Sequence, residues 1–184
     1  MIYSVDLNID VPALAQHLTI DDVPKHAHTR LYTDLHINPK LLELLSELSI
    51  GVSFAESFYM PRYTKSIIHC DTKMFTDIAK MNFVYYGMNS SMNWYQAHDV
   101  AHRDTNPSII GSNYRKYDAS EVTLIHSQSI GCPALVQAGI PHNVTTLRES
   151  RLCISLFLVD LSTHQYLSFS ESINRCRQFI QTPS

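Results

Sequence analysis

Three histidine-containing groups in the sequence have residue types and spacings that could hold a metal ion. In the first, His69 and Asp71 lie two positions apart at the end of the apolar stretch 66–68. On an extended chain, residues i and i+2 project from the same face, so both side chains could reach one ion. The spacing alone is weak evidence, because 10 His and the Asp content of a 184-residue chain produce roughly 0.6 such pairs by chance.

The other two groups lie in a polar stretch further along the chain. His102 and Asp104 repeat the spacing, and with Arg103 they imitate the kinase catalytic-loop triplet, but the other kinase motifs are missing. His98 and His102 could share a zinc ion on a helix, yet Asp99 stands where the metalloprotease pattern has Glu, and no helical period is present. We interpret both groups as loop residues and keep His98 and His102 as candidate substrate contacts.

A histidine further along the chain strengthens the first pair. His142 follows a Gly and Pro turn between two short strand-like stretches, and Arg151 comes nine residues later, at the start of the apolar run 152–159. An arginine at the mouth of a barrel with few charges needs an anionic partner, because an unpaired buried charge is costly. The partner is either an anionic ligand or one of the nearby carboxylates, Glu149 and Glu121.

Short strands and two helices are the elements that must position these residues. The period and capping signals predict helices over residues 38–48 and about 170–180. Stretches rich in β-branched and aromatic residues predict eight strands, at 51–59, 65–69, 79–86, 92–97, 121–126, 134–137, 143–146 and 152–159. This pattern predicts a mainly β fold with flanking helices (α+β), arranged as a barrel or jelly roll.

Two segments stand apart from this pattern. Residues 97–120 are polar and without a clear period, which predicts a long surface loop that could select the substrate. From Val122 to Leu147 the chain has no Asp, Glu, Lys or Arg. We expect this charge-free segment to be buried on both faces or to line a closed cavity.

Composition narrows the class of protein. With 45% hydrophobic residues and no internal linker, we expect one domain over 1–184: helical support over about 1–50, a barrel core over about 51–159, and a strand and helix over about 160–184. A net charge of −3 without a basic cluster disfavours nucleic-acid partners. No apolar run approaches the roughly 20 residues of a membrane span, and the N-terminus has no secretory pattern. Four scattered cysteines favour a reduced, cytoplasmic setting.

Taken together, His69, Asp71, His142 and Arg151 resemble the signature of the Fe(II)- and 2-oxoglutarate-dependent oxygenases. That signature has HxD on one strand, a distal His some fifty or more residues later, and a basic residue shortly after it. The resemblance covers about residues 51–159 and implies a double-stranded β-helix, the cupin-like jelly roll. The spacing from His142 to Arg151 is similar to the prolyl-hydroxylase-like branch, as is Tyr86, about fifteen residues after Asp71.

The resemblance implies a role for each residue. His69, Asp71 and His142 would bind Fe(II), while Arg151, Tyr86 and Ser155 would bind the cosubstrate 2-oxoglutarate; catalysis would be centred on the metal, with no separate acid or base. Arg148 is an alternative to Arg151 and Tyr85 to Tyr86, and Ser155 lies two residues beyond the Arg-x-Ser spacing of some branches. The residues that could face the substrate pocket are Asn82, Asn93, Trp94, His98 and His102.

The substrate is a small molecule or a protein that the sequence does not identify. Two alternatives to the oxygenase remain open. One is a non-catalytic double-stranded β-helix domain that binds a small ligand. The other is a cupin-type metalloenzyme that does not use 2-oxoglutarate, although no HxH precedes His142, as such sites generally require.

Overall fold

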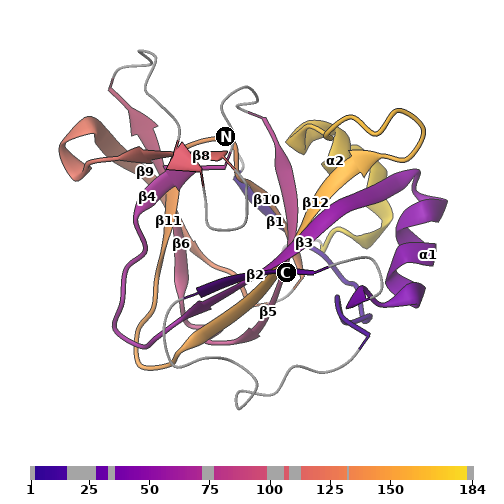
Figure 1. Cartoon of the computed structure of the whole chain (residues 1–184), viewed down its shortest axis with the longest axis horizontal. Helices are drawn as coiled ribbons and strands as arrows, with labels where there is room; N and C mark the ends of the chain where they lie inside the picture. Colours follow the sequence, from indigo (N-terminus) through magenta and orange to yellow (C-terminus); the bar gives the residue numbers. More distant parts are fainter. Residues whose placement is uncertain are drawn as a thin grey trace.

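Two six-stranded antiparallel sheets form the body of the protein (Figure 1). The computed structural model describes residues 3–15, 28–32, 36–71, 77–98, 106–107, 113–131 and 133–181. The first sheet has the order β1 (Ser4–Asp6), β10 (Ala134–Gln137), β5 (Ala79–Tyr86), β12 (Arg151–Asp160), β3 (Ile50–Met60) and β2 (His28–Tyr32). The second has the order β7 (Asn106–Pro107), β8 (Asn113–Tyr117), β4 (Ile68–Cys70), β11 (His142–Thr145), β6 (Ser91–Ala97) and β9 (Val122–Ser129).

The chain passes repeatedly between the two sheets. Strands β3, β5, β10 and β12 belong to the first sheet, whereas β4, β6, β9 and β11 belong to the second. This alternation makes a double-stranded β-helix, which confirms the predicted mainly β jelly roll. All eight predicted strands have a counterpart, although β4 is shorter than predicted and Lys65 contributes only an isolated bridge to Thr145.

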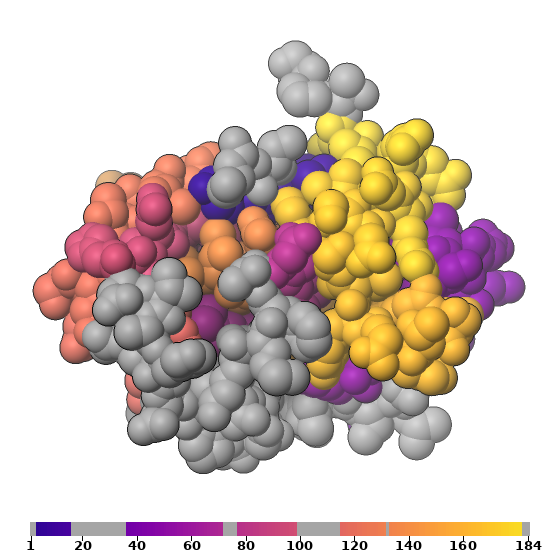
Figure 2. All heavy atoms as spheres, turned by 90° about the horizontal axis from the view of Figure 1, so that it is seen from above, coloured from indigo at the N-terminus to yellow at the C-terminus, as the bar shows by residue number. Residues whose placement is uncertain are grey.

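Two helices cover the outer face of the first sheet. Helix α1 (Pro39–Glu47) is capped by Asn38, whose side chain accepts a hydrogen bond from the Lys40 N–H at 3.0 Å. Helix α2 (Phe169–Arg175) starts with a capping box at Ser168. The described residues also form two short helices, η3 (Ala119–Glu121) and η4 (Arg177–Phe179). Figure 2 shows α1 in purple and the yellow C-terminal residues on the same side of the molecule. None of the helices described is long and apolar enough to cross a membrane.

Several expectations about the flanking segments are wrong. Residues 1–50 do not supply only helical support, because β1 and β2 add to the first sheet. Within 161–181, which the structure describes, there is no strand, only the isolated bridges of Tyr166, Ser168 and Ile180. The predicted loop over 97–120 contains β7 and β8, and β8 pairs with β4. Sequence period missed them because short strands hold too few residues to show one.

The charge-free segment is buried only in part. Strand β10 is buried, as expected, but β9 is an edge strand of the second sheet and is mostly exposed, with Leu124 53% and Ile125 39% accessible. The expectation of burial on both faces is therefore wrong for β9. A lack of charge does not distinguish a buried strand from an exposed neutral one.

Strand β12 lies at the centre of the first sheet and is buried on both faces. One face packs Ile154, Leu156 and Leu158 into the main core beneath the helices. The opposite face, which looks into the barrel, carries Ser155 and Phe157, and pairing places Asn82 and Lys80 of β5 beside them. The barrel interior therefore contains polar and charged groups from the first sheet.

Candidate metal centre

The structure brings His69, Asp71 and His142 together at one place in the barrel. One ligand atom from each residue lies within 4.8 Å of the others. His142 begins β11 and pairs directly with His69 of β4, and the two imidazole ring centroids are 4.6 Å apart. Asp71 comes immediately after β4, where its N–H donates to the Ala138 carbonyl at 3.1 Å. The neighbouring residues His69 and Asp71 thus meet His142, which comes from a strand distant in the sequence.

Both imidazoles are oriented in the same way by the backbone. Nδ1 of His69 lies 3.1 Å from the Ile67 carbonyl oxygen, and Nδ1 of His142 lies 2.9 Å from the Ile140 carbonyl oxygen. With the proton on Nδ1, each ring donates to a backbone carbonyl through this nitrogen. The two Nε2 atoms face Asp71, at 3.3 Å and 3.8 Å from its carboxylate oxygens. Backbone hydrogen bonds of this kind orient metal-binding histidines in proteins.

Burial and charge set the ionisation of the three groups. Burial and the neighbouring His69 lower the pKa of His142 from 6.5 to about 4, so this ring is neutral at pH 7. Burial opposes charge on His69 too, but the hydrogen bond and charge of Asp71 outweigh it and raise the His69 pKa. Burial likewise works against the Asp71 carboxylate, but the Lys80 ammonium and the His69 hydrogen bond hold its pKa well below the usual range.

Two buried charged residues that sequence reasoning missed extend this cluster. The Nζ atom of Lys80 lies 2.8 Å from Oδ2 of Asp71 and 3.3 Å from Oε2 of Glu56. Lys80 and Glu56 are only 3% and 2% exposed. The sequence signal that could have identified them is a single charged residue inside each of two apolar predicted strands: Glu56 in 51–59 and Lys80 in 79–86. Such a charge does not reveal which face of the sheet it occupies.

Ser155 and Asn82 lie next to the charged groups along the same inner face. The Ser155 hydroxyl donates to Oδ1 of Asn82 at 2.6 Å, and both residues are buried. Register pairs Ser155 with Asn82 on one side and with Glu56 on the other. The structure therefore places both predicted residues inside the barrel. Along β12, the Ser155–Asn82 pair lies two residues from the Phe157–Lys80 pair.

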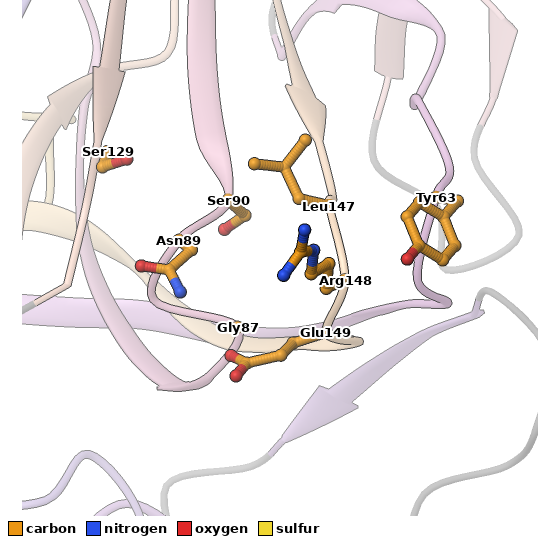
Figure 3. Close-up of a pocket in the computed structure, with 8 residues that line it drawn as sticks. All are labelled: Tyr63, Gly87, Asn89, Ser90, Ser129, Leu147, Arg148 and Glu149. Atoms are coloured by element: carbon orange, nitrogen blue, oxygen red, sulfur yellow. The ribbon is translucent and has the colours of Figure 1, made fainter.

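The structure distinguishes the two candidate arginines. Arg151 is 3% exposed, and no carboxylate among the described residues, Glu149 and Glu121 included, forms an ion pair with it. Its guanidinium lies near the Cys153 thiol. Burial raises the pKa of this thiol, and the interaction with Arg151 works in the opposite direction. Arg148 is exposed and lines a different pocket of about 520 Å³, which Figure 3 shows with the Arg148 side chain beside Ser90 and Glu149.

The two tyrosines of β5 have different surroundings. A register shift between Leu152 and Cys153 places Tyr86 opposite Leu152, and Tyr86 is half-buried, so its predicted role in cosubstrate binding stays a prediction. The Tyr85 hydroxyl accepts a hydrogen bond from the Ala13 N–H at 3.1 Å, which draws it to the outside. From β5, Lys80 turns its ammonium group toward the triad.

Asn93 and Trp94 differ from each other because they occupy opposite faces of β6. Asn93 donates to Oδ1 of Asn143 at 2.9 Å and accepts from Ser127 at 2.7 Å, so it belongs to a network on the outer face and does not face the pocket. Trp94 pairs with His142 and points inward, but it is fully buried in the core and its indole N–H donates to the Gln137 carbonyl.

The remaining predicted contacts lie further out. His98 is exposed, and its Nε2 is 2.7 Å from Oγ1 of Thr123. His102, with the rest of the two loop motifs from Asp99 to Asp104, lies outside the described residues. No contact of His98 with the triad is found in the described part of the chain.

The donor set fits a divalent transition metal. Two imidazole nitrogens and one carboxylate on one side of an ion leave neighbouring positions open, which is the arrangement of non-haem iron sites. His142 is neutral at pH 7 and so meets the requirement that a ligating histidine be deprotonated. The polar inner face beside them, with Lys80, Asn82 and Ser155, offers donors for an acidic ligand.

Comparison with known proteins adds only distant likenesses of structure. No family model matches the chain, and no curated protein matches it. Among solved structures, vicilin from hazelnut (Corylus avellana) is 11% identical with a TM-score of 0.37, over 76% of this chain and 30% of that one.

Two seed globulins are similarly distant. Pumpkin seed globulin is 9% identical with a TM-score of 0.37, over 90% of this chain and 34% of that one. Procruciferin, an 11S globulin of Brassica napus, is 10% identical with a TM-score of 0.35, over 96% of this chain and 38% of that one. The chain thus spans about a third of the length of these proteins. At this distance they carry no information on function, and membership of the oxygenase family stays a prediction.

Proposed function

We propose that this chain is an Fe(II)-dependent oxygenase that uses 2-oxoglutarate as its cosubstrate and oxidises a substrate still to be identified. One observation carries the proposal. Two histidines and one carboxylate from separate parts of the chain meet inside a double-stranded β-helix, with both Nε2 atoms turned toward the carboxylate by backbone carbonyls. A chance cluster of polar residues has no reason to share this orientation.

The chain's own residues would divide the work as follows. His69, Asp71 and His142 would hold the metal, which when bound supplies the site for oxygen activation. Arg151 would bind the far carboxylate of 2-oxoglutarate, because it is a buried cation without an ion-pair partner among the described residues. Asn82 and Ser155 would line the space between the metal and Arg151. The hydrophobic cluster around Trp94 would close one end of the barrel.

The test is anaerobic addition of Fe(II) and 2-oxoglutarate to the purified full chain. We expect a weak visible charge-transfer band, and, once air is admitted, formation of succinate. Asp71→Ala and His142→Ala should each abolish metal binding and the band, while Glu149→Gln, an exposed carboxylate, should change neither. Absence of both the band and succinate would refute the proposal.

A second candidate function is supported by one contact. The Lys80 ammonium already neutralises Asp71 at 2.8 Å, so the barrel could be a metal-free binding domain for a small acid. Calorimetric titration with Mn²⁺ separates the two functions. Micromolar binding that depends on Asp71 supports the metal centre, whereas binding of 2-oxoglutarate without any metal supports the binding domain.

A further inference from the structure

The buried Lys80 stands between two carboxylates with different surroundings. Asp71 also faces His69 and His142, whereas Glu56 contacts no histidine in the described structure and lies deeper in the first sheet. The Lys80 ammonium sits over the Phe157 ring at 3.8 Å from its centroid, and the Phe58 ring lies 5.3 Å away. These aromatic faces and the two carboxylates hold the ammonium inside the barrel, where Lys80 is 3% exposed.

The charges of this cluster conflict with those of a bound metal. Without metal, the single Lys80 ammonium is shared between two carboxylates, those of Asp71 and Glu56. A divalent cation held by the triad would share Asp71 with the ammonium, and two cations a few ångströms apart repel strongly in a buried site. Metal binding therefore requires Lys80 to give up Asp71 while it keeps a counter-charge.

Glu56 is the group that can supply that counter-charge. Its Oε2 is already 3.3 Å from Nζ, and it reaches Lys80 from β3, on the far side of β12 from the Lys80 backbone. We infer that Glu56 is a positioning residue of the metal centre: it draws the Lys80 ammonium away from Asp71 and so leaves Asp71 free to bind a divalent cation. The inference rests on the proposed metal-binding role of the triad.

A double-mutant cycle with Mn²⁺ as the probe tests it. Glu56→Gln, Lys80→Met and the double variant of the full chain are titrated by calorimetry. We expect Glu56→Gln to weaken Mn²⁺ binding at least tenfold, because Lys80 then depends on Asp71 alone. Lys80→Met should tighten it at least tenfold. In the Lys80→Met background, Glu56→Gln should change the affinity less than threefold.

The cycle separates positioning from simple attraction. If Glu56 only attracted the metal through its charge, Glu56→Gln would weaken binding equally with and without Lys80, and the inference would be wrong. An unchanged affinity in Glu56→Gln would overturn it too. If the wild-type chain and all variants melt normally but bind no Mn²⁺, the metal centre itself fails and the inference fails with it. Binding by the wild type without the expected coupling overturns the inference alone.

Matched variants guard against effects of folding and of surface charge. Lys65→Met and Glu149→Gln remove exposed charges of the same kinds and should leave Mn²⁺ affinity unchanged. If Glu56→Gln does not fold, Glu56→Asp keeps the charge with a shorter reach and should weaken Mn²⁺ binding by an intermediate amount. Normal affinity in a folded Glu56→Asp protein would then contradict the requirement for contact with Lys80.

Discussion

Replacing Arg151 with methionine would test the cosubstrate site without touching a metal ligand. Arg151 opens β12 and is 3% exposed, and it has no carboxylate partner among the described residues. Methionine fills a similar volume and removes the charge. We expect Arg151→Met to bind metal normally and to bind 2-oxoglutarate more weakly.

The size of the effect follows from burial. A hydrogen bond to a charged group contributes about 1.5–3 kcal/mol when it is shielded from water, which corresponds to a loss of affinity of roughly 10- to 150-fold. Arg148 is exposed in its own pocket, where an ion pair is screened and contributes about 0.2–1 kcal/mol. Arg148→Met should therefore weaken 2-oxoglutarate binding by less than about fivefold.

Affinity is best measured on the metal-loaded protein. The two variants and the wild type are loaded anaerobically with Fe(II), and the charge-transfer band is followed as 2-oxoglutarate is added. Mn²⁺ calorimetry without 2-oxoglutarate checks that the triad is intact in each. Normal 2-oxoglutarate affinity in Arg151→Met would refute the reasoning, and a large loss in Arg148→Met would move the role to Arg148.

Three further predictions concern stability. Gly87 has φ +73°, and a Cβ at this position would meet a carbonyl oxygen at 2.6 Å. Gly87→Ala should therefore lower the free energy of unfolding, measured by urea titration, by at least ~1 kcal/mol. Gly131→Ala should have little effect, because the atom nearest to its added Cβ would be 3.6 Å away. The Asn143 side chain is fully buried, accepts two hydrogen bonds and donates one. Asn143→Ala should therefore lower the free energy of unfolding by about 2–4 kcal/mol. Replacement of the exposed Asn89 by Ala should lower it by less than about 0.5 kcal/mol. For His142, the folded pKa of about 4 lies below the unfolded value of 6.5, so the unfolded chain takes up the proton first as pH falls. Chelator-treated protein should therefore lose up to ~3 kcal/mol of stability between pH 6.5 and pH 4, and an equal loss in His142→Asn would contradict this assignment.

Local features of the chain were predictable because they depend on neighbouring residues. Asn38 and the leucines after it define α1, and the strand-like stretches correspond to the main strands of both sheets. The histidine and aspartate two positions apart on β4 share a face by strand geometry alone, and so could be proposed as joint ligands. The pairing of His142 with His69 was reached only through a family resemblance.

The residues around the triad could not be predicted because their positions depend on long-range pairing. Lys80 and Glu56 meet only because β12 lies between β5 and β3 and aligns their inner faces. A register irregularity in β5 places Tyr86, and not Tyr85, opposite Leu152, and such a shift of one residue cannot be seen in a period-2 pattern. The sequence by itself determined which residues could ligate a metal and which segments form strands. Only the tertiary structure decided which charges accompany those ligands, because strand order and register place side chains from distant segments in one buried volume.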